Sequence, residues 1–388
     1  MSAGEATGTR KQFHLWQRKN APFCAGGCGK NGMENVVKKE KGKEKGRDMG
    51  KRKHRKMGVW RCAGAFSAWI IGSGFATGQE TAQFFARYGR SGWRGVLAVG
   101  IGLLVLGGAA VLAGYEHREN EKFDHFRYFC GPVLGTVYDL VTPAAVILMM
   151  PVLLSGGGTA LYEGCGMERR LGTLCLAGLV LAAWRVGFER FTAAAAWTAP
   201  VVILFSLAVG AVTVAERGPS VPVQAGAGWG KSAFLYLSMN AWGASAYHCS
   251  LGKQVRSSRA GLGGAVLGTA ALTGAIALLC AALQGGPAMG LSVPTLYLAQ
   301  RIHPFLGTCF FWVLLAGIFT SCSAMLWTVC PRKQGGRRAV LVMGTALLLG
   351  MFPFQKLVGS LYPLMGWIGA PYVLCVCGSI FLKRTQQW

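Results

Sequence analysis

The sequence predicts an all-α, polytopic membrane protein with about ten transmembrane helices. Of its 388 residues, 52% are hydrophobic and only 14% are charged, whereas a soluble globular chain carries about 25% charged residues. Several apolar runs are close to 20 residues long, and about 20 residues are enough for a helix to cross roughly 30 Å of hydrocarbon. We therefore expect the lipid bilayer to surround most of the chain.

The first predicted segment, about 59–88, combines helix-breaking residues with a carboxylate. It contains the run Gly72–Gly74, then Gly78 and Glu80. A glycine inside a helix costs about 1 kcal/mol relative to alanine, and broken backbone survives in a bilayer only where it is buried in protein or lines a cavity. An ionisable residue at membrane depth marks a functional site. We predict two short helices around a break; the alternative is a packing site that lets another helix approach closely.

Nine further segments follow the remaining apolar runs. The third contains Asp139, and the sixth contains Ser238, Asn240 and Gly243 near its middle. The predicted segments after the first are about 92–115, 131–156, 171–187, 192–215, 231–250, 260–283, 304–329, 338–353 and 356–382.

The formal net charge of +25 could suggest a nucleic-acid partner, so its distribution matters. Residues 1–57 hold 16 Lys and Arg against 5 Asp and Glu, a net charge of +11, and much of the remaining excess lies between apolar segments. We therefore expect no nucleic-acid partner. Residues 1–57 are predicted to be a basic, disordered cytoplasmic extension. An even number of segments and the positive-inside rule place both termini in the cytoplasm of a multi-pass protein of the cell membrane.

Segments one and six occupy matching places if the chain is five segments plus five, with repeats at about 58–215 and 231–384. A pair of interrupted segments in corresponding positions is the best sequence indication of a transporter binding site. Helix ends at such breaks offer free N–H groups to anions and free carbonyls to cations. The alternative for Asn240 is a hydrogen bond between helices, worth about 0.6 kcal/mol on average. The predicted substrate-binding residues are Gly72, Ser73, Gly74, Phe75, Ser238 and Asn240.

Three stretches resemble the YkvI-type bacterial membrane proteins. They are Gly72-Ser-Gly-Phe-Ala-Thr-Gly-Gln-Glu80, Tyr236-Leu-Ser-Met-Asn240 and Tyr362-Pro-Leu-Met-Gly366-Trp-Ile-Gly369. Those proteins are similar to the amino acid–polyamine–organocation transporters, which have the LeuT-type five-plus-five inverted repeat. The resemblance covers about 58–384. It implies a transmembrane transporter domain with broken helices one and six, and a small solute such as an amino acid as substrate.

The resemblance also implies candidates for ion coupling. In sodium-coupled members of this fold, hydroxyl groups on the eighth helix join carbonyls of the broken first helix around one Na⁺; here Thr320 and Ser321 could supply those hydroxyls. The alternative is that both pack between helices. Proton coupling through Glu80 or Asp139 is equally open, although Asp139 could instead pair with an arginine or a hydroxyl. No cofactor beyond Na⁺ or H⁺ is expected.

No enzyme is indicated, because the sequence lacks a Gly-x-Ser-x-Gly elbow, a Walker loop and a metal-binding helix pair. The expected function is secondary transport of a small-molecule substrate by alternating access. The alternative is a ligand sensor or scaffold that keeps the transporter fold without transporting. The oligomeric state does not follow from the sequence.

Overall fold

The computed structural model describes residues 56–385 except 72, 121, 187–191, 218–225 and 332–335. The chain divides into two units, Met1–Arg55 and Lys56–Trp388, and the predicted basic extension lies almost wholly outside the described residues. Within the described part, every regular element is a helix. The prediction of an all-α fold is therefore confirmed.

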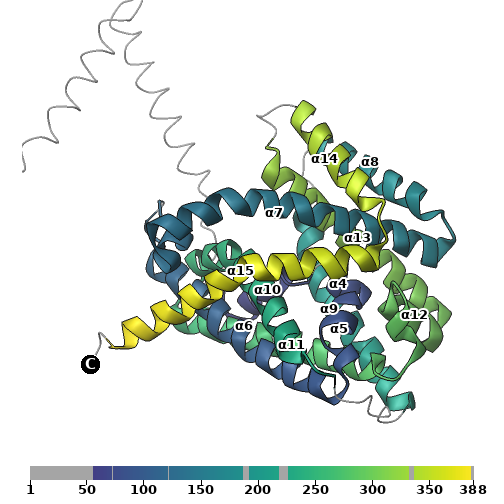
Figure 1. The fold of residues 1–388 in the computed structure, drawn as a ribbon, viewed down its shortest axis with the longest axis horizontal. Coiled ribbons are helices and arrows are strands. Elements are labelled where there is room, and N and C mark those ends of the chain that lie inside the picture. Colours follow the sequence, from purple (N-terminus) through teal and green to yellow (C-terminus); the bar gives the residue numbers. More distant parts are fainter. Residues whose placement is uncertain are drawn as a thin grey trace, which may run out of the picture. The chain divides into compact units, whose positions relative to one another are not determined.

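The first segment is discontinuous, as predicted. It consists of α3 (Val59–Ala68), α4 (Ser73–Thr77), α5 (Gln79–Phe84) and the 3₁₀ turn η1 (Ala86–Tyr88). A second interruption, which the sequence reading missed, lies at Gly78, whose φ of 85° is left-handed. Glycine adopts this conformation at no steric cost because it has no Cβ. In Figure 1, α4 and α5 are short pieces between longer helices.

The rest of the first half consists of long helices. They are α6 (Arg90–Glu116), α7 (His125–Cys165), α8 (Arg169–Val186) and α9 (Thr192–Arg217). α7 is kinked at Gly131, where φ is 75° and ψ is 178°. A Cβ on Gly135 would lie 2.7 Å from the backbone nitrogen of Arg127, so the turn before the kink packs directly on the turn after it.

The second half contains five long helices and two short elements. They are α10 (Trp229–Gln254), α11 (Ser258–Leu283), η3 (Pro287–Gly290), α12 (Pro294–Ile302), α13 (Pro304–Val329), α14 (Gly336–Gly350) and α15 (Phe354–Thr385). The predicted eighth segment and α13 have the same bounds. The linker before it was not expected to be helical.

The prediction that segment six is broken is wrong, because α10 is one continuous helix. The polar side chain of Asn240 does not require an interruption of the helix, because it finds its hydrogen-bond partner within α10. The Asn240 amide donates to the carbonyl of Tyr236 one turn earlier, at 2.9 Å. A single interior glycine, Gly243, costs at most about 1 kcal/mol and is tolerated.

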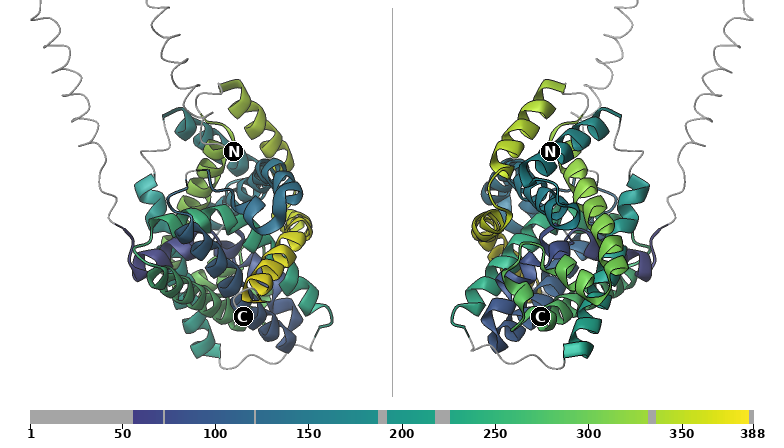
Figure 2. Two further views of the ribbon diagram at one scale, coloured as in Figure 1. Left: turned by 90° about the vertical axis from the view of Figure 1, so that its left-hand side faces the viewer. Right: turned by 90° about the vertical axis from the view of Figure 1, so that its right-hand side faces the viewer.

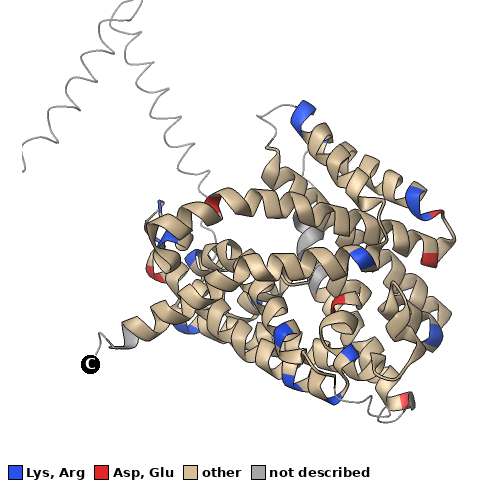
Figure 3. Cartoon of the chain, in the orientation of Figure 1, with Lys and Arg blue, Asp and Glu red and all other residues tan. Residues whose placement is uncertain are grey.

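Five described helices are long and apolar enough to cross a membrane by length and composition. They are Arg90–Glu116, His125–Cys165, Ser258–Leu283, Pro304–Val329 and Phe354–Leu382, and Pro200–Glu216 is a shorter apolar helix. Figure 3 shows long uncharged stretches, with Lys, Arg, Asp and Glu mainly towards helix ends. α15 lies along one side in both views of Figure 2 and exposes Trp367 and Leu374. The full count of ten spans remains a prediction.

Glycines bring three helices into backbone contact. A Cβ on Gly114 of α6 would overlap the carbonyl oxygen of Cys249 in α10. A Cβ on Gly366 of α15 would lie 2.6 Å from the carbonyl oxygen of Leu235, also in α10. Small residues allow this approach in membrane helices, so α6, α10 and α15 form a tightly packed block.

Candidate functional site

A buried carboxylate lies at the start of α5. The side chain of Glu80 is 4% exposed. It accepts a 3.0 Å hydrogen bond from the Tyr236 hydroxyl, and it is also hydrogen-bonded to the Tyr362 hydroxyl and to the backbone of Phe75. Its partners come from α10, α15 and α4. Among the described residues, Glu80 has no basic side chain within ion-pair distance.

The local sequence explains how the carboxylate reaches this position. The N–H of Gly78 bonds to the carbonyl of Phe75 at 2.9 Å, which closes α4 before α5 begins. A Cβ on Gly74 would overlap the Glu80 carboxylate and lie 2.7 Å from the Tyr362 hydroxyl. Gly74 is therefore required by the close approach of two functional groups to the backbone of α4.

Aromatic rings enclose the carboxylate. The Tyr236 ring lies 5.3 Å from the Phe84 ring and 5.1 Å from the Phe85 ring, and Phe84 is 6.5 Å from Tyr362. Phe75, a predicted substrate-binding residue, is fully buried. Rings that exclude water lower the local dielectric and strengthen the electrostatic interactions of the charge inside.

Amide side chains tie α5 to the second half of the chain. Gln79 donates to the carbonyl of Leu291, and Gln83 donates at 3.2 Å both to the Gln79 side chain and to the carbonyl of Gln355. Gln355 in turn donates to the carbonyl of Gly290 at 3.0 Å. This network holds α5 against η3 and the start of α15. The sequence did not predict it, because the bonds of Gln79 to Leu291 and of Gln83 to Gln355 join residues more than 200 positions apart.

The remaining predicted substrate residues have different surroundings. Gly72 and the side chain of Ser73 lie outside the described part of the chain. Ser238 is fully buried, and its hydroxyl has no hydrogen-bond partner among the described residues. Asn240 bonds to its own helix. Thus Gly74, Phe75 and Glu80 are brought together, whereas Ser238 and Asn240 make no hydrogen bond to Glu80 within the described ranges.

The two candidate Na⁺ ligands lie on α13, which packs against α4. The Thr320 hydroxyl is mostly buried and donates to the carbonyl of Gly317 at 3.1 Å. Ser321 is half-buried. Nearby, Ser323 is 3% exposed, and its hydroxyl finds no partner in the part of the chain that the structure describes. The structure therefore leaves the sodium site a prediction.

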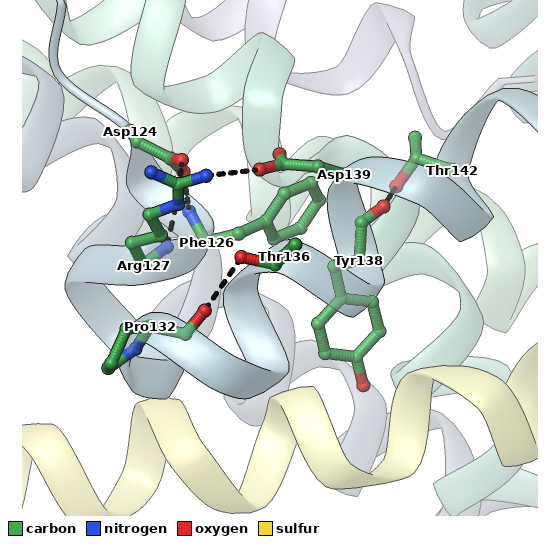
Figure 4. Close-up of polar contacts among 8 residues, drawn as sticks. All are labelled: Asp124, Phe126, Arg127, Pro132, Thr136, Tyr138, Asp139 and Thr142. Carbon is green, nitrogen blue, oxygen red and sulfur yellow. Dashed lines mark hydrogen bonds and ion pairs between the residues drawn. The ribbon is translucent and has the colours of Figure 1, made fainter.

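Asp139 lies in a separate cluster at the start of α7 (Figure 4). Its carboxylate is 3.8 Å from the guanidinium of Arg127, and 44% of its side chain is exposed. Arg127 also pairs at 3.1 Å with Asp124, which caps the helix by accepting from the N–H groups of Phe126 and Arg127. The arginine partner is one of the alternatives that the sequence offered for Asp139.

Comparison with known proteins gives one relative and a set of similar folds. No protein-family model matches the chain. It is 24% identical over 333 residues to the uncharacterized membrane protein YkvI of Bacillus subtilis (strain 168), covering 82% of this chain and 94% of that protein.

Among the solved structures similar to this one are two transporters. Mhp1 in an inward-facing conformation gives a TM-score of 0.56 at 14% identity, over 86% of this chain and 79% of that one. MhsT in complex with L-phenylalanine gives a TM-score of 0.52 at 16% identity, and the match covers 82% of this chain and 87% of that one. At these identities, the likeness establishes the fold.

Proposed function

We propose that this chain, a YkvI-type membrane protein with the LeuT-type fold, is a secondary transporter that moves a small solute by alternating access. One observation carries the proposal. The broken first segment places the buried carboxylate of Glu80 beside a helix interruption, where it bonds to hydroxyls from two other helices. A purely structural site has no need of an unpaired acid at this depth, since burying one is costly.

The proposed solute site lies at the interruption between α3 and α4. The interruption directly precedes Gly74 and Phe75, and the short α4 packs against α7 and α13. Free N–H groups at a helix start favour a carboxylate, and free carbonyls favour an ammonium or a metal cation. An amino acid or a related compound carries both kinds of group. The buried hydroxyl of Ser238 and the amide of Asn240 are the proposed contacts from α10.

The proposed coupling group is Glu80. Two hydroxyls and one backbone group hold the Glu80 side chain in the observed packing. A conformation that separates α5 from α10 and α15 would change these contacts and, with them, the affinity of the carboxyl group for a proton. Coupling to Na⁺ through Thr320 and Ser321 is the second candidate. Asp139 is a weaker candidate, because it is half-exposed and already forms an ion pair with Arg127.

The test is a melting curve of the purified protein against a panel of amino acids and related amines, with and without Na⁺. A ligand at 100 times its dissociation constant adds about 2.7 kcal/mol of stability. Compounds that raise the melting temperature are then tested for uptake into proteoliposomes. Uptake supports the transporter. Binding without uptake under any ion gradient would instead support a ligand sensor with this fold.

A further inference from the structure

A cavity of about 200 Å³ lies between the last turns of α8 and the first turns of α14, two helices that lie side by side in Figure 1. Two glycines help to form the hollow. No atom lies within 4 Å of a Cβ built on Gly178, and only the Trp184 ring, at 4.0 Å, lies near one built on Gly336. The lining residues include Gly178, Ala182, Trp184, Arg185, Gly336 and Val340.

The back wall of this cavity is held in place. Trp184 is 7% exposed, and its indole N–H donates a 2.8 Å hydrogen bond to the carbonyl of Cys330 at the end of α13. A buried tryptophan with its polar atom satisfied is a rigid surface. The hollow is thus part of the packed structure.

Apolar side chains lead away from the cavity along both helices. α8 exposes Leu171, Leu174 and Leu179, each by about half of its surface, and α14 exposes Leu341 and Leu348 by about 70%. Leu171 and Leu174 are three residues apart and Leu341 and Leu348 are seven apart, so each pair lies on one face of its helix. In a membrane protein such a face contacts lipid chains.

Positive charge gathers at the cavity end of these apolar faces. Arg185 lines the cavity in the last turn of α8, and Arg337 and Arg338 lie in the first turn of α14. The other two arginines of α8, Arg169 and Arg170, lie at its opposite end, directly after Glu168.

We propose that this cavity binds an anionic phospholipid, with the phosphate at Arg185 and Arg337 and an acyl chain along the apolar faces of α8 and α14. Arginine presents a planar fork of donors that matches a phosphate. Basic pockets between transmembrane helices on the cytoplasmic side bind anionic head groups, and the proposed topology places this end there. The site is independent of the solute and of the coupling ion.

The experiment uses the full chain, purified in a neutral detergent and stripped of lipid. Native mass spectrometry measures binding of phosphatidylglycerol and of phosphatidylcholine with identical acyl chains. We expect preferential binding of phosphatidylglycerol, and the variant Arg185→Gln with Arg337→Gln should weaken it roughly fivefold for each arginine removed. Filling the hollow with Gly178→Phe should also weaken binding while both arginines remain.

The matched control is Arg169→Gln with Arg170→Gln, which removes the same charge at the other end of α8. It should bind phosphatidylglycerol as the unaltered chain does. Equal binding of the two lipids, or equal losses in the two arginine variants, would overturn the proposal. Inorganic phosphate that displaces phosphatidylglycerol at equal concentration would also overturn it, because the acyl chain would then contribute nothing.

Discussion

The hydroxyl of Tyr236 donates a 3.0 Å hydrogen bond to the carboxylate of Glu80, although 156 positions separate the two residues in the chain. Both side chains are buried. An acid on the broken first segment is therefore connected directly to α10.

If Glu80 carries the coupled proton, Glu80→Gln should abolish solute uptake driven by a pH gradient and leave solute exchange intact. Glutamine keeps the shape of the side chain but cannot gain or lose a proton at the pH values of such an assay. Uptake into proteoliposomes measures both reactions, and Glu168→Gln, at an exposed position, is the control. Undiminished pH-driven uptake by the Glu80→Gln variant would remove Glu80 from the mechanism.

Tyr236→Phe should lower the free energy of unfolding by about 1–3 kcal/mol, the usual cost of leaving a buried polar group without a hydrogen-bond partner. The ring contacts with Phe84 and Phe85 would remain. Melting temperature reports the change. Tyr247→Phe removes a hydroxyl from a tyrosine that stacks on Trp69 and is the comparison; equal losses in the two variants would contradict a specific role for the bond to Glu80.

Gly74→Ala should destabilise the protein by about 1–3 kcal/mol, as overpacking in a filled interior does, because the new methyl group must displace Glu80 or Tyr362. Gly64→Ala, on α3 of the same segment, meets no atom within 4 Å. This variant should instead raise the free energy of unfolding by as much as about 1 kcal/mol, because alanine has a higher helix propensity than glycine. Thermal unfolding of both variants tests the contrast, and similar values for the two would refute it.

Thr320→Ala combined with Ser321→Ala should remove any stabilisation that Na⁺ gives over K⁺ in a melting curve. Both substitutions delete hydroxyl oxygens, which are suitable ligands for an alkali cation. Thr328→Ala, at an exposed position on the same helix, should change nothing. If Na⁺ still raises the melting temperature of the double variant above its value in K⁺, the cation binds elsewhere.

Asp139→Asn should change stability by less than about 1 kcal/mol, because half-exposed ion pairs contribute little, and the pair with Arg127 is 3.8 Å long. Uptake driven by a pH gradient should stay close to that of the unaltered protein. A loss as large as that of Glu80→Gln would restore Asp139 as a coupling group.

The sequence was sufficient to predict the long helices and the first interruption, because both depend on local composition, whereas the short α12 was not predicted. The apolar run at about 304–329 predicted the bounds of α13 correctly, and the glycines at Gly72–Gly74 predicted the break in the first segment. The same logic failed at α10. There Asn240 satisfies its amide within its own helix, which no pattern of residue types distinguishes from a true interruption.

The site was only partly predictable, since its members meet through tertiary packing. Glu80 stood out as an acid in an apolar segment. Its partners Tyr236 and Tyr362 lie within the stretches that resemble the YkvI-type proteins, but nothing local in the sequence places their hydroxyls beside Glu80. The left-handed conformation of Gly78 was also not predicted.

The backbone contacts of α10 with α15 have a mechanical consequence for the acid. Tyr236 and Tyr362 belong to two helices that touch through Gly366 and Gly369 without intervening side chains, so the packing fixes the two hydroxyls relative to each other. Under the proposed alternating access, a joint movement of α10 and α15 away from α5 would break both hydrogen bonds to Glu80 together. The acid would then have two hydrogen-bonding states, without a series of intermediates between them.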